Sequence, residues 1–232
     1  MRFTQRLSHF RVLFSALLAV VCLTLVFPSV ARAQGAWESV GVIDGVAVWK
    51  KEVPGTNLLA FKGEVTADVT MDKLIGVFLD KNERKNWVDR YGDSREVEKP
   101  GPLSEIYWIK FNLPVGISNR DYVLRADANA NAATGVFTAN IHSVVHPRVP
   151  ESSCCVRAEA RGTYYRFEAL KGVNKVKLTV EVQTDPKGLL PGWVVNMIQK
   201  SWPSKTLNSL VRRANSGAVT PRAEYAGWHS RP

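Results

Sequence analysis

The chain has 232 residues, of which 45% are hydrophobic, and it carries 31 basic against 21 acidic residues, a formal net charge of +10 at pH 7. This length fits one domain with a sizeable core, and the three cysteines are too few for a fold built on disulfides. The basic residues form no run interleaved with aromatic residues of the kind that single-stranded nucleic acids need, so a nucleic acid is not the expected partner.

The N-terminal segment, residues 1–33, has the pattern of a secretory signal peptide. Three arginines precede an apolar run at residues 12–27, and Ala31 and Ala33 stand where a signal peptidase expects small residues. Cleavage after Ala33 would place the mature chain in the periplasm or otherwise outside the cytoplasm. An uncleaved anchor and a lipid attached at Cys22 are the alternatives.

The mature chain is expected to form one domain over residues 34–215. The leader contains four arginines and no acidic residue, so the formal charge falls to +6 without it. Such moderate basicity suits either contact with anionic lipid head groups or simple solubility. Residues 216–232 contain glycine and proline without apolar periodicity, which predicts a flexible C-terminal tail.

The N-terminal part of this domain begins with a predicted hairpin. Residues 46–53 and 58–67 are β-branched or alternate in polarity, and Pro54-Gly55 separates them. Asp68-Val69-Thr70 then predicts the start of a short helix, and a second helical piece is expected over residues 83–91.

An antiparallel meander and a long helix are predicted for the rest of the domain. The strand candidates are residues 95–98, 106–113, 122–129, 135–145, 155–169 and 175–184. A helix follows near Pro191, with apolar residues at helical spacing. Pro203 removes a backbone donor and should kink or split this helix, which gives either a lid or a static bend.

Small side chains on one face of two strands predict an apolar cavity. The alternate positions are Val156, Ala158, Ala160 and Gly162 in one strand and Tyr122, Leu124, Ala126 and Ala128 in the other. A sheet that curls around a helix must fill its concave side or leave room there for a ligand. Because an empty apolar cavity loses contacts, a ligand is the simpler explanation, although close packing against the long helix would also use small residues.

The two cysteines of the mature chain, Cys154 and Cys155, are sequence neighbours. On a strand their side chains would point to opposite faces, and their Cα atoms lie closer than an ordinary disulfide allows. Two separate thiols are therefore expected, with a vicinal disulfide as the alternative.

Three segments, in order along the chain, resemble the START family of lipid-transfer domains. They are Glu83-Arg84-Lys85-Asn86-Trp87, Leu113-Pro114 with Ser118-Asn119-Arg120-Asp121-Tyr122-Val123, and Asp185-Pro186-Lys187-Gly188-Leu189-Leu190-Pro191-Gly192-Trp193. The resemblance covers most of the mature chain and implies an α+β helix-grip fold, in which a curved antiparallel sheet wraps a long C-terminal helix around an apolar cavity. With its predicted leader, the chain resembles a bacterial-type exported member.

The resemblance implies that the chain binds a single lipid and carries it between membranes. Arg84 matches an arginine that meets the lipid phosphate in phospholipid-carrying relatives, a role that suits a guanidinium; the alternative is an ordinary surface arginine. The apolar loop 113–119 resembles a mobile loop that closes the tunnel against the C-terminal helix. Val115 and Ile117 would be its gate residues and would suit transient contact with a membrane surface.

Further ligand contacts are expected on the sheet and on the long helix. Sterol-carrying relatives place an acid and an arginine inside the tunnel, and the corresponding positions here, Ile109 or Lys110 and Ala126, offer no such pair. Strand parity leaves four polar candidates for a lipid hydroxyl or head group. With the apolar candidates, the predicted ligand-binding residues are Arg84, Tyr107, Tyr122, Asn140, His142, Tyr164, Trp193 and Met197.

No common catalytic motif occurs in the sequence, which has no Gly-x-Ser-x-Gly elbow, no His-Glu-x-x-His and no glycine-rich phosphate loop. His142 and His146 would lie about 13 Å apart on a strand, too far to share a metal ion. We therefore expect a monomeric carrier of phospholipid, sterol, fatty acid or another apolar molecule, with no enzyme activity, cofactor or metal. The alternatives are a lipid sensor or assembly factor that acts through a protein partner, and a cyclase- or aromatase-like enzyme.

Overall fold

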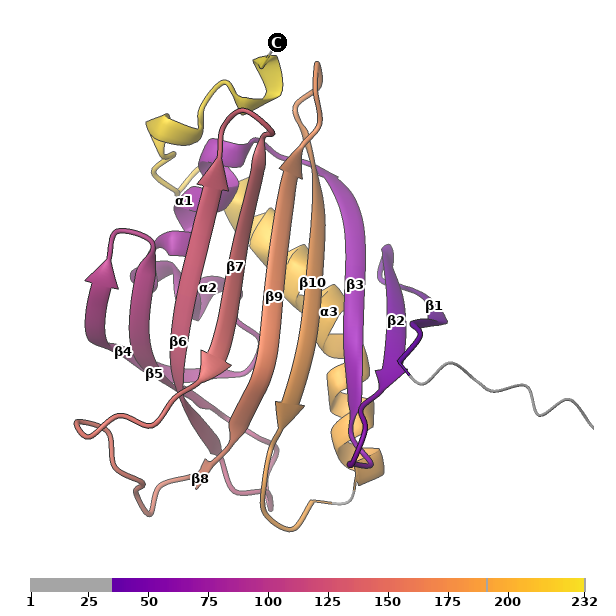
Figure 1. Ribbon diagram of the computed structural model, residues 1–232, viewed down its shortest axis with the longest axis vertical. Helices are drawn as coiled ribbons and strands as arrows, with labels where there is room; N and C mark the ends of the chain where they lie inside the picture. The colour runs from indigo at the N-terminus through magenta and orange to yellow at the C-terminus, as the bar shows by residue number, and fades with distance from the viewer. Residues whose placement is uncertain (1–34, 191, 232) are drawn as a thin grey trace, which may run out of the picture. The chain divides into compact units, whose positions relative to one another are not determined.

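A ten-stranded sheet dominates the computed structural model, which describes residues 35–190 and 192–231 (Figure 1). The chain divides into two units, Met1–Ala33 and Gln34–Pro232, and the described residues belong to the second. The predicted signal peptide and Pro191 lie outside the described residues. The strands are β1 (Glu38–Ile43), β2 (Val46–Glu52), β3 (Leu59–Asp68), β4 (Tyr91–Gly101), β5 (Ser104–Phe111), β6 (Arg120–Asn131), β7 (Val136–Ser143), β8 (Val156–Arg157), β9 (Glu159–Ala169) and β10 (Lys175–Asp185).

The strands pair antiparallel in the order β1-β2-β3-β10-β9-β7-β6-β5-β4, and the short β8 pairs parallel with β6. All the long helices lie on one face of this sheet (Figure 1). The helices are α1 (Met71–Leu79), η1 (Lys81–Glu83), α2 (Arg84–Trp87), α3 (Gly192–Ala214), η2 (Ala223–Tyr225) and η3 (Trp228–Ser230).

The predicted hairpin, short helix, meander and C-terminal helix are all present, with four differences. The strand β1 was not predicted, and the second helical piece ends at Trp87 because the chain turns there into β4. The strand predicted over residues 155–169 is broken at Ala158 into β8 and β9. Helix α3 runs through Pro203 without a break, so the proline is accommodated inside one helix and does not split it.

The core lies between the sheet and the helices. Strands β3, β7 and β9 place Phe61, Phe137 and Phe167 on the helix side, where at most 2% of each side chain is exposed. Leu207 and Leu210 of α3 pack into the same cluster and are fully buried. Alternation along the strands and the apolar side of the helix therefore meet in the largest apolar cluster of the domain.

The middle of α3 packs closely against Gly63 of β3. A Cβ atom at Gly63 would lie 2.6 Å from Cβ of Pro203 and 3.2 Å from Cγ1 of Val46. Gly63→Ala is therefore expected to push α3 off the sheet and lower the free energy of unfolding by about 1–3 kcal/mol, the usual cost of overpacking.

Gly162→Ala is the matched control, because nothing lies within 4 Å of the Cβ position at Gly162. Urea denaturation of the two variants measures the difference. Equal stability of both variants would show that the contact between β3 and Pro203 yields without cost.

The C-terminal segment is packed over residues 216–231 and is not a flexible tail there, which corrects the expectation for this part of the chain. Tyr225 and Trp228 are each 5% exposed and join the core cluster beside α1. The backbone N–H of Met71 donates to Nε2 of the buried His229 over 3.2 Å, and Gly172 donates to the His229 carbonyl. Glycine and proline shape the turns of this segment, while its two aromatic side chains supply the apolar anchor.

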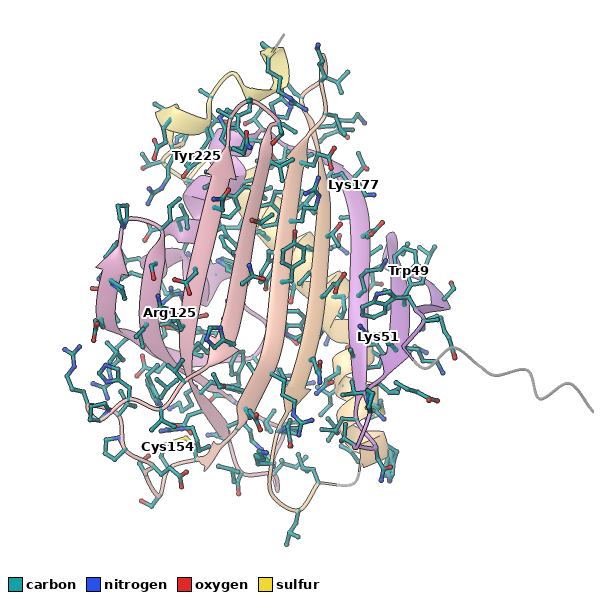
Figure 2. The ribbon with its side chains drawn as sticks, viewed as in Figure 1. Trp49, Lys51, Arg125, Cys154, Lys177 and Tyr225 are labelled. Atoms are coloured by element: carbon teal, nitrogen blue, oxygen red, sulfur yellow. A yellow bond between two sulfur atoms is a disulfide. The ribbon has the colours of Figure 1, made fainter. Side chains whose placement is uncertain are left out.

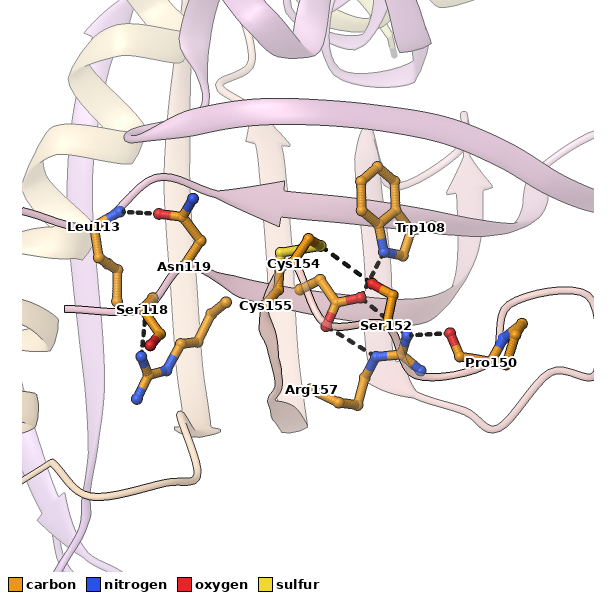
Figure 3. The surroundings of a disulfide bond; sticks show 11 residues. Trp108, Leu113, Ser118, Asn119, Pro150, Ser152, Cys154, Cys155 and Arg157 are labelled. Atoms are coloured by element: carbon orange, nitrogen blue, oxygen red, sulfur yellow. Dashed lines mark hydrogen bonds and ion pairs between the residues drawn. A yellow bond between two sulfur atoms is a disulfide. The ribbon is translucent and has the colours of Figure 1, made fainter.

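Cys154 and Cys155 form a disulfide, contrary to the expectation of separate thiols (Figure 3). The expectation assumed a strand, but the pair lies in a turn before β8, so its side chains are not directed to opposite faces of a sheet. The Ser152 hydroxyl donates to Sγ of Cys154 over 3.2 Å.

Candidate functional site

A cavity of about 280 Å³ lies between the sheet and the helices. A single water molecule takes up about 30 Å³ of liquid volume, so a space of this size is not a packing defect. The small side chains that the sequence analysis placed on the inner face contribute to its wall, namely Ala126, Ala128 and Ala160, joined by Ala139. The predicted cavity is therefore present, and its volume results from alanine at positions where larger side chains would fill it.

The polar end of the cavity is formed by α2 and β5. Residues two apart on a strand share a face, and Glu105 and Tyr107 of β5 both line the cavity. Arg84 of α2 forms an ion pair with Glu105, and its guanidinium carbon lies 3.9 Å from the centre of the Tyr107 ring. Burial lowers the pKa of Arg84, but the electrostatic interactions with Tyr107 and Glu105 raise it by more. The pKa is therefore raised overall, and the guanidinium stays charged.

Several residues that line this cavity have a buried polar atom without a hydrogen-bond partner. Within residues 35–190 and 192–231, six buried side-chain nitrogen or oxygen atoms lack a partner, and five of them belong to residues of the cavity wall. Each such atom costs about 1–3 kcal/mol unless something else in the cavity supplies the missing bond. The five are Nη1 of Arg84, Nε1 of Trp87, Oε1 of Glu105, Oε1 of Gln199 and Oγ1 of Thr206.

Two loops border the other end of the cavity, loop 113–119 before β6 and loop 186–190 before α3. Arg120 joins them, because its guanidinium donates to the carbonyls of Pro186 (2.9 Å), Lys187 (3.0 Å) and Ser118. Leu113 and Leu190 from these loops line the cavity. We call this end of the cavity, bordered by the two loops, the mouth.

Asp121, the residue after Arg120, anchors the neighbouring segment. Its carboxylate accepts hydrogen bonds from Nε (3.0 Å) and Nη2 (2.9 Å) of Arg157 in β8 and from Nε1 of Trp108 (2.7 Å). The same guanidinium donates to the carbonyls of Val149 and Pro150. Arg120 and Asp121 thus hold the loops in place.

Large apolar side chains are exposed around the mouth. Val115 and Leu189 project fully into solvent, and Trp193 and Met197 in the first turns of α3 are 70% and 60% exposed. We call these four residues the mouth patch. All lie on loops or helix turns at the same end of the sheet (Figure 1). The second predicted gate residue, Ile117, is partly buried in loop 113–119.

A model of the START domain matches residues 22–218. The chain belongs to this family. Human START domain-containing protein 10 is 26% identical over 189 residues, which cover 80% of this chain and 64% of the relative, so the chain spans less than two thirds of that protein's length. Bovine phosphatidylcholine transfer protein is 28% identical over 195 residues, 82% of this chain and 89% of the relative. The crystal structure of human STARD10 has a TM-score of 0.69 at 25% identity and covers 77% of this chain and 72% of that chain.

The sheet and C-terminal helix of this START domain confirm the predicted helix-grip fold. Membership of a lipid-binding family also confirms the prediction of a binding protein and not an enzyme. No described helix is long and apolar enough to cross a membrane, and the described residues contain no group of three potential metal ligands.

The structure brings only part of the predicted site of the START domain to the cavity. Arg84, Tyr107 and Tyr122 line it, and Tyr122 packs edge-on against the ring of Phe111. Trp193 and Met197 do not line it, because α3 turns Val195 and Gln199 inward and these two outward. The first turns of α3 are apolar almost all round, so the sequence pattern did not distinguish the two faces.

Asn140 and His142 were predicted to face the ligand, but they lie on the outer face of the sheet. Ala126 lines the cavity and pairs with Ile141, so the neighbours of Ile141 must point the other way. His142 pairs with Arg125, which Figure 2 shows on the face away from α3.

Tyr164 also lies on the outer face, because β9 contains a bulge. Ala160 pairs with Thr184 and Gly162 pairs with Gln183, so β9 has one residue more than β10 at this point. The extra residue shifts the alternation, and Tyr165 takes the inward position that parity had assigned to Tyr164.

Sequence reasoning missed Glu105, Gln199 and Thr206 in the cavity wall. Glu105 precedes the predicted contact Tyr107 by two positions, which was a usable signal on a strand. Gln199 and Thr206 are seven residues apart on α3 and share a face, but a polar residue on a helix is usually assigned to the solvent side.

Proposed function

We propose that this START domain binds one lipid in the cavity and carries it, as a monomer, between membranes in an extracytoplasmic compartment. The observation that carries the proposal is the cavity itself, with an apolar wall of alanine and branched side chains and five partnerless polar atoms. An apolar wall with a few convergent polar groups suits an amphipathic ligand. Sterol, fatty acid and other apolar cargoes are outcomes that the tests below separate from phospholipid.

The Arg84 end of the cavity suits the head group of a zwitterionic phospholipid. Nη1 of Arg84 and Nε1 of Trp87 are donors without a partner, and phosphate oxygens accept from such donors. Oε1 of Glu105 is an acceptor without a partner and suits a cationic or N–H group. Because Glu105 balances the charge of Arg84, the subsite suits a head group of no net charge. Bovine phosphatidylcholine transfer protein, a relative by sequence, carries phosphatidylcholine in its name.

We further propose that the lipid enters at the mouth and that loop 113–119 acts as the gate against α3. Arg120 couples this loop to loop 186–190 by hydrogen bonds to carbonyls, which require no particular side chain in either loop. The mouth patch presents apolar side chains at the same end, suited to transient insertion into a membrane surface.

Leu189→Glu is expected to slow the transfer of phosphatidylcholine between vesicles by roughly 10-fold while leaving lipid binding unchanged. Contact of a leucine with a membrane contributes about 1.5–3 kcal/mol, and 1.4 kcal/mol is a factor of ten. The matched control is Val173→Glu, since Val173 is also exposed but lies in the turn between β9 and β10 at the opposite end of the sheet.

A fluorescence transfer assay between donor and acceptor vesicles measures these rates. Equal rates for the two variants would contradict membrane contact through the mouth patch. A wild-type protein that binds lipid but does not transfer it would contradict the carrier role and support the lipid sensor.

The proposed location outside the cytoplasm is supported by the leader pattern in residues 1–33 and by the disulfide between Cys154 and Cys155, since disulfides persist in oxidising compartments. The intact mass of the protein recovered from its producing cells should correspond to a chain that begins at Gln34. A mass that retains Met1 would contradict export by cleavage.

A further inference from the structure

Helix α3 brings two buried polar side chains to a wall that is otherwise largely apolar. Gln199 is 8% exposed and Thr206 is 1% exposed, and both line the cavity with Trp202 between them. Seven residues are two helical turns, so the two side chains lie about 10 Å apart along the helix.

The orientation of the Gln199 amide is determined by Thr184 of β10. Nε2 of Gln199 lies 3.1 Å from the carbonyl oxygen of Thr184 and 2.7 Å from its hydroxyl. A carbonyl oxygen only accepts, so the atom that faces it must be the N–H₂ group. Oε1 of Gln199 is then left buried with no partner among the described residues.

Pro203 adds to the acceptor character of this turn. In an α-helix the carbonyl of residue 199 would accept from the N–H of residue 203, and proline has none. Oγ1 of Thr206 is also without a partner, although a buried helical threonine commonly donates to the carbonyl four residues earlier. The carbonyl of Gln199 therefore lacks the N–H donor that residue 203 would supply in an ordinary helix, and Oε1 of Gln199 has no partner among the described residues.

This acceptor lies far from the subsite of Arg84 and Glu105. Glu105 is on β5, and Thr184, which holds the Gln199 amide, is on β10. Three strands, β9, β7 and β6, lie between them, so the two strands are four steps apart in the sheet. At about 4.8 Å per strand, the separation measured along the sheet is about 19 Å. Gln199 therefore lies on a different part of the cavity wall from Arg84 and Glu105.

We infer that the ligand carries a hydrogen-bond donor, a hydroxyl or amide N–H, on its apolar body, apart from its head group, and that Gln199 selects it. The inference rests on the proposed function and names the chemical class of its cargo. Unsubstituted acyl chains offer no donor and would leave Oε1 of Gln199 buried without a bond. Gln199 is thus a specificity-determining residue for hydroxylated or amide-containing lipids.

The test compares octadecanoic acid with a series of monohydroxylated octadecanoic acids whose hydroxyl occupies successive chain positions. Their affinities are measured by displacement of a fluorescent fatty acid from the wild-type mature domain, from Gln199→Met and from the matched control Gln183→Met. Methionine is apolar and close in size to glutamine. Gln183 lies on β10, next to Thr184, and its side chain lines the hollow of the outer face.

At least one hydroxylated acid should bind wild type and Gln183→Met between about 2-fold and about 10-fold more tightly than octadecanoic acid, the contribution of one net hydrogen bond. Gln199→Met should bind octadecanoic acid at least as tightly as wild type, which also shows that it is folded, and should lose the preference.

The inference would be overturned if wild type preferred no hydroxylated acid over octadecanoic acid, or if Gln199→Met kept the same preference. Binding of octadecanoic acid in either case would leave the proposed function standing. Binding of no fatty acid and no vesicle lipid by any of the three proteins would contradict the proposed function and this inference with it.

Discussion

Asp121→Asn is expected to lower the free energy of unfolding by about 3–5 kcal/mol, the usual cost of breaking a buried ion pair from one side. The Asp121 carboxylate is buried and accepts three hydrogen bonds, two from Arg157 and one from Trp108. An asparagine turns an N–H₂ group toward one of these donors and leaves the guanidinium without its counter-charge. The segment before β8 should loosen as well, since Arg157 also holds the carbonyls of Val149 and Pro150.

The matched control is Asp127→Asn. Asp127 also accepts two hydrogen bonds from an arginine, Arg125, but its side chain is 42% exposed. A surface pair of this kind contributes about 0–1 kcal/mol. Urea denaturation at pH 7 measures both variants, and a loss at Asp121 no larger than the loss at Asp127 would contradict the anchoring role of Asp121.

The pH dependence of stability provides a second readout for Asp121. Burial raises the pKa of this carboxyl group, but the hydrogen bonds from Arg157 and Trp108 outweigh burial, and the pKa lies below its ordinary value. A carboxyl group with a lowered pKa stabilises the folded state above the unfolded pKa of about 3.9, and this contribution is lost as the pH falls through the folded value. The difference between wild type and Asp121→Asn should therefore shrink below about pH 4.

Arg84→Met is expected to weaken the binding of phosphatidylcholine by roughly 10-fold to 150-fold, which corresponds to about 1.5–3 kcal/mol for hydrogen bonds to a charged group. The substitution removes the partnerless donor Nη1 that would meet the phosphate. The matched control is Arg166→Met, because Arg166 forms a similar ion pair with Glu168 (3.0 Å) at the exposed surface of β9. Titration with phosphatidylcholine vesicles measures both affinities.

Arg84→Met also leaves Glu105 without its ion-pair partner, so loss of folding must be separated from loss of binding. The double variant Arg84→Met with Glu105→Gln restores neutrality and should recover stability without recovering affinity. Glu105→Gln alone leaves Arg84 uncompensated and should shift preference from phosphatidylcholine toward anionic phospholipids. Unchanged affinity in the double variant would show that the pair is structural and does not contact the head group.

Much of the fold could be predicted because its signals are local. The alternation around Phe61 and the alanines of β6 depend only on neighbours in the sequence, and they led correctly to the hairpin, the meander and the cavity. Pro203 was correctly expected within the long helix, but its fit depends on Gly63, which is distant in sequence and packs against it.

The site was harder to predict because it depends on register and on contacts between distant segments. One extra residue in β9 reversed the face assigned to Tyr164. Asn140 was assigned to the cavity from strand parity, although its pairing with Asp127 places it outside. The free oxygen of Gln199 arises only because Thr184, on another element, occupies the amide nitrogen. Such signals exist only in three dimensions.

Native mass spectrometry of the mature domain, residues 34–232, purified from its producing cells, tests the central claim most directly. The protein should carry one lipid per chain, and extraction should identify an amphipathic molecule with a phosphate-containing head group. Protein that carries no bound mass, and takes up none when offered vesicles of mixed lipids, would contradict the claim that the cavity is a lipid-binding site.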